Sequence, residues 1–161
     1  MPTTTVEQRL RTFLLWLAGS MCIGTTVELF LAKHYEDPLQ LLPFVLCGVG
    51  LIVVVAVLRR QQRARLLALR GVMSLLLLGS LLGIYEHLVN NFAFELEMRP
   101  SAVWSEVWFQ ALRGAAPLLA PGILAVAAVV AIAATYAHPA LARGNAAEQK
   151  AHPATGEPTL R

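Results

Sequence analysis

The stretch Gly79-Ser-Leu-Leu-Gly83-Ile-Tyr-Glu86-His87-Leu-Val-Asn90-Asn91 ends a leucine-rich run and carries two ionisable side chains next to each other. A charged side chain at the centre of a membrane span costs roughly 2.5–3.5 kcal/mol on the insertion scale, so it usually has a partner and a function. The stretch therefore predicts a membrane helix with a polar end.

The composition of the whole chain is that of a membrane protein. Of 161 residues, 57% are hydrophobic and 14% are charged, against about 45–50% and about 25% in soluble domains. A span needs about 20 mainly apolar residues, and the sequence offers four such runs. We therefore expect an all-α, polytopic membrane protein, with a four-transmembrane-helix bundle in residues 1–138. The expected spans are about 12–32, 40–58, 70–92 and 115–137, and residues 139–161 are expected to form a disordered cytoplasmic tail.

Lys and Arg residues are distributed unevenly along the chain. All but three of the 13 lie in the amino terminus, the 59–70 loop or the tail. By the positive-inside rule both termini are then cytoplasmic, and the loops at 33–39 and 93–114 face outward. We expect the bacterial cytoplasmic (inner) membrane as the location. Because topology accounts for the net charge of +3, no nucleic-acid partner is expected.

The second outward loop contains an amphipathic segment. After Pro100, Trp104 and Trp108 share one side of a short helix that Ser101 would cap and Gly114 would end. This pattern predicts an external interfacial helix with its tryptophans at headgroup depth. The alternative is an outward extension of the fourth span.

Glu28 in the first span and Glu86 in the third each lie about 9 Å inside the expected outer end of the helix. At equal depth they can meet, and two close carboxylates can share a proton or a bound cation. We therefore predict a polar pocket at the outer end of the bundle. Its expected lining residues are Glu28, His34, Glu86, His87, Asn90 and Asn91.

Small residues suggest how these spans pack. Gly79 and Gly83 form a GxxxG pattern in the third span, and Ser20 and Gly24 form a similar pair in the first. We expect the two spans to touch along these residues.

Pro117 and Pro121 lie near the start of the fourth span. Each removes a backbone donor and crowds the preceding turn, so they predict a kinked or irregular outer segment.

No zinc-protease, phosphate-loop, nucleophile-elbow or CxxC signature occurs, so an enzyme is the less favoured class, and the sequence identifies neither a metal nor a cofactor. We expect an integral membrane accessory or structural subunit. Its partners would be the lipid bilayer and either another membrane protein or a second copy of itself. One alternative is a small transporter that binds a proton or a divalent cation. A second is a redox protein with a haem between His34 and His87.

Overall fold

The computed structural model describes residues 5–114 and 119–142. These residues fold into helices and include no β-strand, which confirms the all-α prediction. In chain order the elements are α1 (Thr5–Leu31), the short 3-10 helix η1 (Pro38–Leu41), α2 (Leu42–Arg59), α3 (Arg63–Met98), α4 (Trp104–Leu112) and α5 (Leu119–Ala133).

Three helical segments are long and apolar enough to cross a membrane: α1, the continuous segment of η1 and α2, and α3. The fourth predicted span corresponds to α5, which has 15 residues and a length of about 22 Å. The hydrocarbon core of a bilayer is about 30 Å thick. Residues 115–118 lie outside the described part of the chain, so the fourth span stays a prediction.

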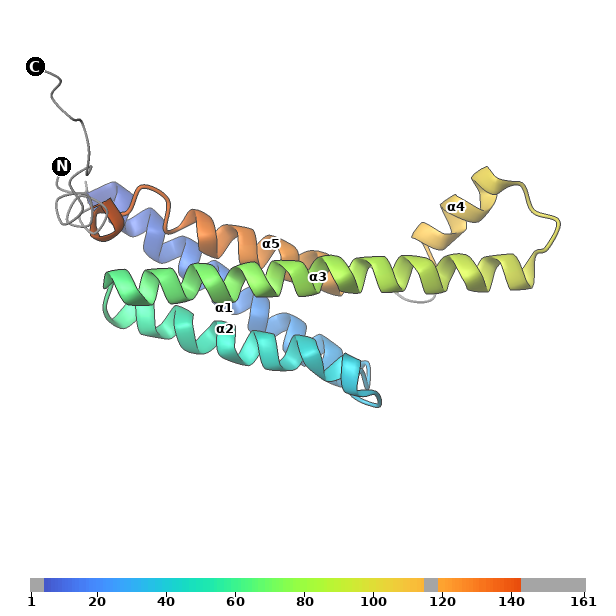
Figure 1. Ribbon diagram of the computed structural model, residues 1–161, viewed down its shortest axis with the longest axis horizontal. Coiled ribbons are helices and arrows are strands. Elements are labelled where there is room, and N and C mark those ends of the chain that lie inside the picture. The colour runs from blue at the N-terminus through green and yellow to red at the C-terminus, as the bar shows by residue number, and fades with distance from the viewer. Residues whose placement is uncertain (1–4, 115–118, 143–161) are drawn as a thin grey trace, which may run out of the picture.

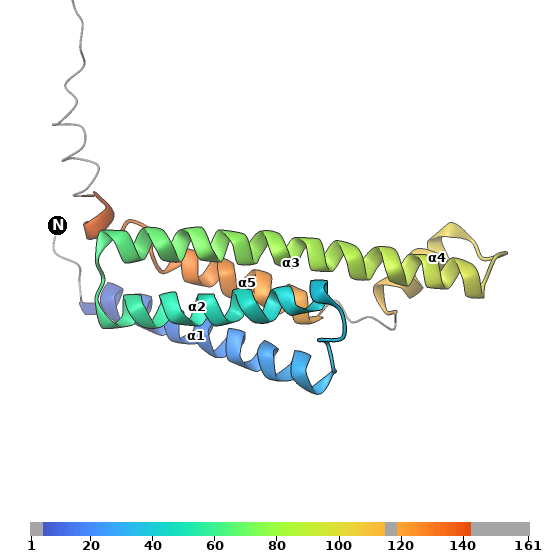
Figure 2. The same cartoon turned by 60° about the horizontal axis from the view of Figure 1, so that its bottom comes forward.

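The helices α1, α2, α3 and α5 lie side by side as a bundle (Figures 1 and 2). The extensive contacts join α1 to α2, α2 to α3, α3 to α5 and α5 to α1, so the helices follow one another around the bundle in that order. Ala127, Ala128 and Ala131 of α5 are completely buried. These small side chains allow α5 to lie closely against both α1 and α3.

The prediction that the first and third spans touch along their small residues is wrong. α1 and α3 are not among the helix pairs in extensive contact. On α1, Leu15 and Leu29 belong to the buried face, whereas Ser20 and Gly24 are exposed. Within the described structure, no atom of a neighbouring element lies within 4 Å of the position that a Cβ would take at Gly24. The small residues of α1 therefore face outward.

The helix α3 extends beyond the rest of the bundle. Its 36 residues span about 54 Å, which exceeds the roughly 40–45 Å of a bilayer with its headgroups. Its last turns project past α1, α2 and α5, and α4 folds back against them (Figure 1). There the ring of Phe92 lies 5.4 Å, centroid to centroid, from both Trp104 and Trp108. This packing stabilises helix beyond residue 92, where the sequence predicted its end.

The helix α4 is separate from α5, but it begins at Trp104 and not directly after Ser101. Its N-cap residue is Val103, which makes no side-chain capping bond. Val107 is buried against α3, whereas Trp104 and Phe109 are 67% and 68% exposed. The helix thus presents an aromatic face, and its place in a membrane interface stays a prediction.

At the other end of the bundle, arginine side chains donate to backbone carbonyl groups at or near helix ends. Arg70 donates to the hydroxyl and the carbonyl oxygen of Thr135, at 2.7 and 3.1 Å. Arg11 donates to the carbonyl of Ala134, at 3.3 Å, and Arg65 to a carbonyl near the end of α2, at 2.9 Å. Cations at helix C-termini are favourable because they oppose the helix dipole. These arginines therefore stabilise the bundle in addition to any effect on topology.

The start of the expected tail is ordered. Residues 139–142 form a helical turn. His138 begins this turn, because its Nδ1 accepts a hydrogen bond from the Ala140 N–H at 3.2 Å. The Nε2–H of His138 then donates to Oε1 of Gln61, at 2.9 Å. The remainder of the predicted tail, residues 143–161, lies outside the described residues.

Candidate functional site

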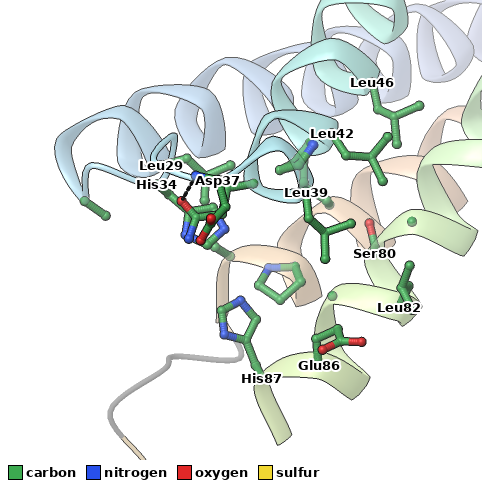
Figure 3. Close-up of a pocket in the computed structure, with 18 of the residues that line it drawn as sticks. Leu29, His34, Asp37, Leu39, Leu42, Leu46, Ser80, Leu82, Glu86 and His87 are labelled. Atoms are coloured by element: carbon green, nitrogen blue, oxygen red, sulfur yellow. Dashed lines mark hydrogen bonds between the residues drawn. The ribbon is translucent and has the colours of Figure 1, made fainter. Parts of the chain in front are cut away.

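A pocket of about 940 Å³ opens at the end of the bundle opposite the first residues of α1 (Figure 3). Its walls come from the end of α1, the connection that contains η1, the first turns of α2, the middle of α3 and the first turns of α5. Ligand pockets in proteins usually measure about 300–1,000 Å³, so this one is large enough for a small molecule.

Five of the six residues predicted to form a polar pocket line this one. Asn91 is the exception. The residues that the structure brings together are Glu28, His34, Glu86, His87 and Asn90.

The two histidines come from different elements and meet at the pocket. The rings of His34 and His87 lie 5.9 Å apart, centroid to centroid, with 28° between their planes (Figure 3). Two hydrogen bonds at the end of α1 fix the backbone of His34. The His34 N–H donates to the carbonyl of Leu29, and the Lys33 N–H donates to the carbonyl of Phe30. This is the Schellman arrangement, which needs a left-handed residue before His34. Lys33 takes that role with φ = 53°.

The acids stand on opposite walls. Glu28 lies one turn before the end of α1, Glu86 precedes His87 on α3, and Asp37 precedes η1. Among the described residues, no Lys or Arg lines the pocket. The N-terminal end of the continuous η1–α2 segment lies at the pocket and contributes about half a positive charge. Three carboxylates exceed that contribution, so the pocket favours cations.

The deeper part of the pocket is apolar. Leu46 and Leu76 line it together with Leu82 and Leu124. Ser80 lies among them, but its hydroxyl donates to a carbonyl of its own helix at 2.7 Å, so it offers a ligand only its oxygen lone pairs.

Apart from His34, sequence reasoning missed the residues of the connection between α1 and α2 that line the pocket. Asp37, Leu39 and Gln40 all line the pocket. The side-chain oxygen of Gln40 accepts the Glu36 N–H at 2.9 Å and thereby folds the connection. An acid directly before a proline is a signal for such a helical turn.

Gly79 and Gly83 do pack against other helices, but not against α1. A Cβ at Gly79 would lie 2.9 Å from Cδ1 of Leu46 on α2, and one at Gly83 would lie 3.3 Å from Cβ of Pro121 on α5. Both glycines also line the pocket. Their lack of a side chain therefore permits the close approach of two neighbours and leaves space for the pocket between them.

Of the two prolines predicted to kink the fourth span, Pro121 lies in the first turn of α5. Its missing N–H would have no partner within the helix at that position, so the proline is tolerated there. Pro117 lies outside the described residues.

Asn91 lies outside the pocket and connects α3 to α4. It is 4% exposed, and its Nδ2 donates to the carbonyl of Ala111 at 3.0 Å. A Cβ at Gly114 would lie 2.5 Å from Cγ of Asn91, so the turn after α4 requires glycine there. Asn91 thus has a structural role in the described fold.

The arrangement supports cation binding better than metal coordination. In residues 5–114 and 119–142, no three His, Cys, Asp or Glu side chains are placed to hold one metal ion. Comparisons with protein-family models, curated proteins and solved structures find no match for this chain.

Proposed function

We propose that this chain is an integral protein of the bacterial inner membrane that binds a positively charged ligand in an outward-facing pocket. The observation that carries the proposal is the convergence of Glu28, Glu86 and Asp37 on one cavity that has no Lys or Arg among its described lining. The transporter alternative named a proton or a divalent cation; because no three-ligand cluster occurs in residues 5–114 and 119–142, we propose a monovalent or organic cation in place of a divalent metal.

Three span-length helices support the membrane assignment. The excess of Lys and Arg at one end supports an orientation with both termini in the cytoplasm. In that orientation the pocket opens on the outer side. α5 would complete a four-helix bundle.

Impermeant thiol reagents test this orientation. The two native cysteines, Cys22 and Cys47, are completely buried and should stay unlabelled in folded protein. A cysteine at the exposed Ser105 should react in intact cells, whereas one at the exposed Gln62 should react only after permeabilisation. The reverse pattern would contradict the orientation.

Thermal unfolding in an uncharged maltoside detergent tests the binding. Ammonium ions, from methylammonium to octylammonium, are compared with sodium at equal ionic strength. A ligand at ten times its Kd stabilises the folded state by about 1.4 kcal/mol, which raises the Tm of a domain of this size by about 3–6 °C. At least one ammonium ion should raise the Tm of the wild type but not that of Glu28→Gln/Glu86→Gln. Equal shifts in both proteins, or no shift in either, would overturn the proposal.

A membrane accessory subunit is the second candidate. The aromatic face of α4, with Trp104 and Phe109 exposed, favours it, because aromatic residues are enriched where proteins meet a partner or the headgroup layer. Co-purification of a stoichiometric membrane partner, lost in Trp104→Ala/Phe109→Ala, would favour this candidate.

The haem alternative uses His34 and His87, whose rings stack against each other and would have to turn to ligate one iron between them. An absorption spectrum of the purified protein tests it. A Soret band that disappears in His87→Ala would favour a haem protein, and its absence would remove this alternative.

A further inference from the structure

The size of the pocket restricts the class of cation. A water molecule takes about 30 Å³, so a hydrated inorganic ion would occupy a small part of the 940 Å³. A larger molecule is needed to displace the solvent from the remainder. A metal ion or a proton would leave most of this volume to water or lipid, whereas an organic cation would occupy more of it.

The charged residues of the lining gather at one end of the pocket, and apolar residues line the rest. The acids and the two histidines stand at the level of the α1–α2 connection, as Figure 3 shows for His34, Glu86 and His87. Leu46 and Leu76 lie farther along α2 and α3, towards the bundle centre. A ligand that fits both parts has a charged head and an apolar body.

We infer that the pocket takes an amphipathic organic cation, that is, an ammonium group carrying a hydrocarbon body. The ammonium group lies between Glu28 and Glu86 beside the histidine pair, and the hydrocarbon lies on the leucines below. This inference rests on the proposed function, because it names the class of cation that the same site binds. The ammonium group can belong to a free amine or to the ethanolamine headgroup of a membrane lipid.

Calorimetric titration with n-alkylammonium ions of increasing length tests the inference, with the full-length protein in uncharged maltoside micelles. Each methylene that reaches the leucines should lower Kd by up to about fourfold, until the apolar part of the pocket is full. Glu28→Gln/Glu86→Gln should weaken octylammonium binding at least about tenfold. The control Glu97→Gln/Glu106→Gln removes the same charge from exposed residues outside the pocket and should leave Kd unchanged.

The outcomes separate the inference from the proposed function. If methylammonium binds as tightly as octylammonium, and only to protein with intact pocket acids, the apolar body is irrelevant and the inference is overturned while the proposed function stands. If octylsulfonate binds as tightly as octylammonium, or if the pocket variant binds like the wild type, both are overturned.

Added phosphatidylethanolamine distinguishes the two sources of the ammonium group. Competition that raises the apparent Kd of octylammonium assigns the site to a lipid headgroup. An unchanged Kd assigns it to a free amine.

Discussion

Replacing Gly83 with leucine tests the packing that shapes the pocket. Even a methyl group at this position would lie 3.3 Å from Cβ of Pro121, so α3 and α5 would have to separate by a few tenths of an ångström. For Gly83→Ala, the gain of about 0.5–1 kcal/mol in helix propensity offsets this strain, and we expect little net change. Leucine adds further carbons to the same contact, and overpacking of this kind costs about 1–3 kcal/mol.

Gly24→Leu is the matched control. Gly24 belongs to the other small-residue pair of the sequence, but it is exposed and no neighbouring element of the described structure comes within 4 Å of a Cβ there. We expect no loss of stability, and a gain of up to about 1 kcal/mol from helix propensity. Unfolding by sodium dodecyl sulfate in mixed micelles, followed by circular dichroism, measures both variants.

A loss at Gly24 equal to that at Gly83 would refute the helix order around the bundle or indicate a second copy packed on α1. Dilution separates these outcomes, because only a dimer interface makes stability depend on protein concentration.

Three further predictions concern single residues. Lys33→Gly should stabilise the protein by about 1 kcal/mol in the same unfolding assay, because a non-glycine residue at φ = 53° is strained; a loss of stability would contradict this. Asn91→Leu removes the buried hydrogen bond to the Ala111 carbonyl and should destabilise the α3–α4 contact by about 1–2 kcal/mol. We expect faster hydrogen exchange in α4, and unchanged exchange would contradict this prediction. Burial, with a smaller contribution from Arg11, lowers the pKa of His138 below the ordinary value of 6.5. As the pH falls, the unfolded chain is therefore protonated at this histidine before the folded protein is. The contribution of His138 to the stability of the fold is then lost as the pH falls below about 6.5. Nuclear magnetic resonance titration should show this lowered pKa, and a value above 6.5 would contradict it.

The long helices could be predicted because apolar runs of about 20 residues with almost no charged residues are typical of membrane spans. These runs did not predict which face of a span is buried. In a membrane the outer face is as apolar as the inner one, so hydrophobic periodicity does not separate Leu15 and Leu29, which are buried, from Phe13 and Trp16, which are exposed. The small residues Ser20 and Gly24 predicted which face of the first span is buried, but on α1 both residues are exposed.

Five of the six residues predicted for the pocket line one cavity, whereas the predicted contact between the first and third spans does not form. Helical rise, counted from the outer ends of the spans, predicts that Glu28 and Glu86 lie equally far inside the bundle. This distance from the helix end depends little on which helices touch. Asn91 follows Asn90 by one residue and therefore points to a different side of the helix, where α4 covers it. The sequence did not show that α4 would fold back on α3, because that contact joins segments separated by a loop with no pattern of its own.

The most direct test of the central claim is to find where a cationic ligand binds. An alkylammonium ion with a photoreactive diazirine at the end of its chain is crosslinked to the protein in micelles, with and without excess octylammonium, and the labelled peptides are identified by mass spectrometry. We expect competable labelling at pocket-lining residues, namely Leu42, Leu46, Leu76, Leu82 and Leu124, and its loss in Glu28→Gln/Glu86→Gln. Labelling confined to the exposed aromatic face of α4, or labelling that neither octylammonium nor the double variant reduces, would contradict the assignment of this pocket as a cation-binding site.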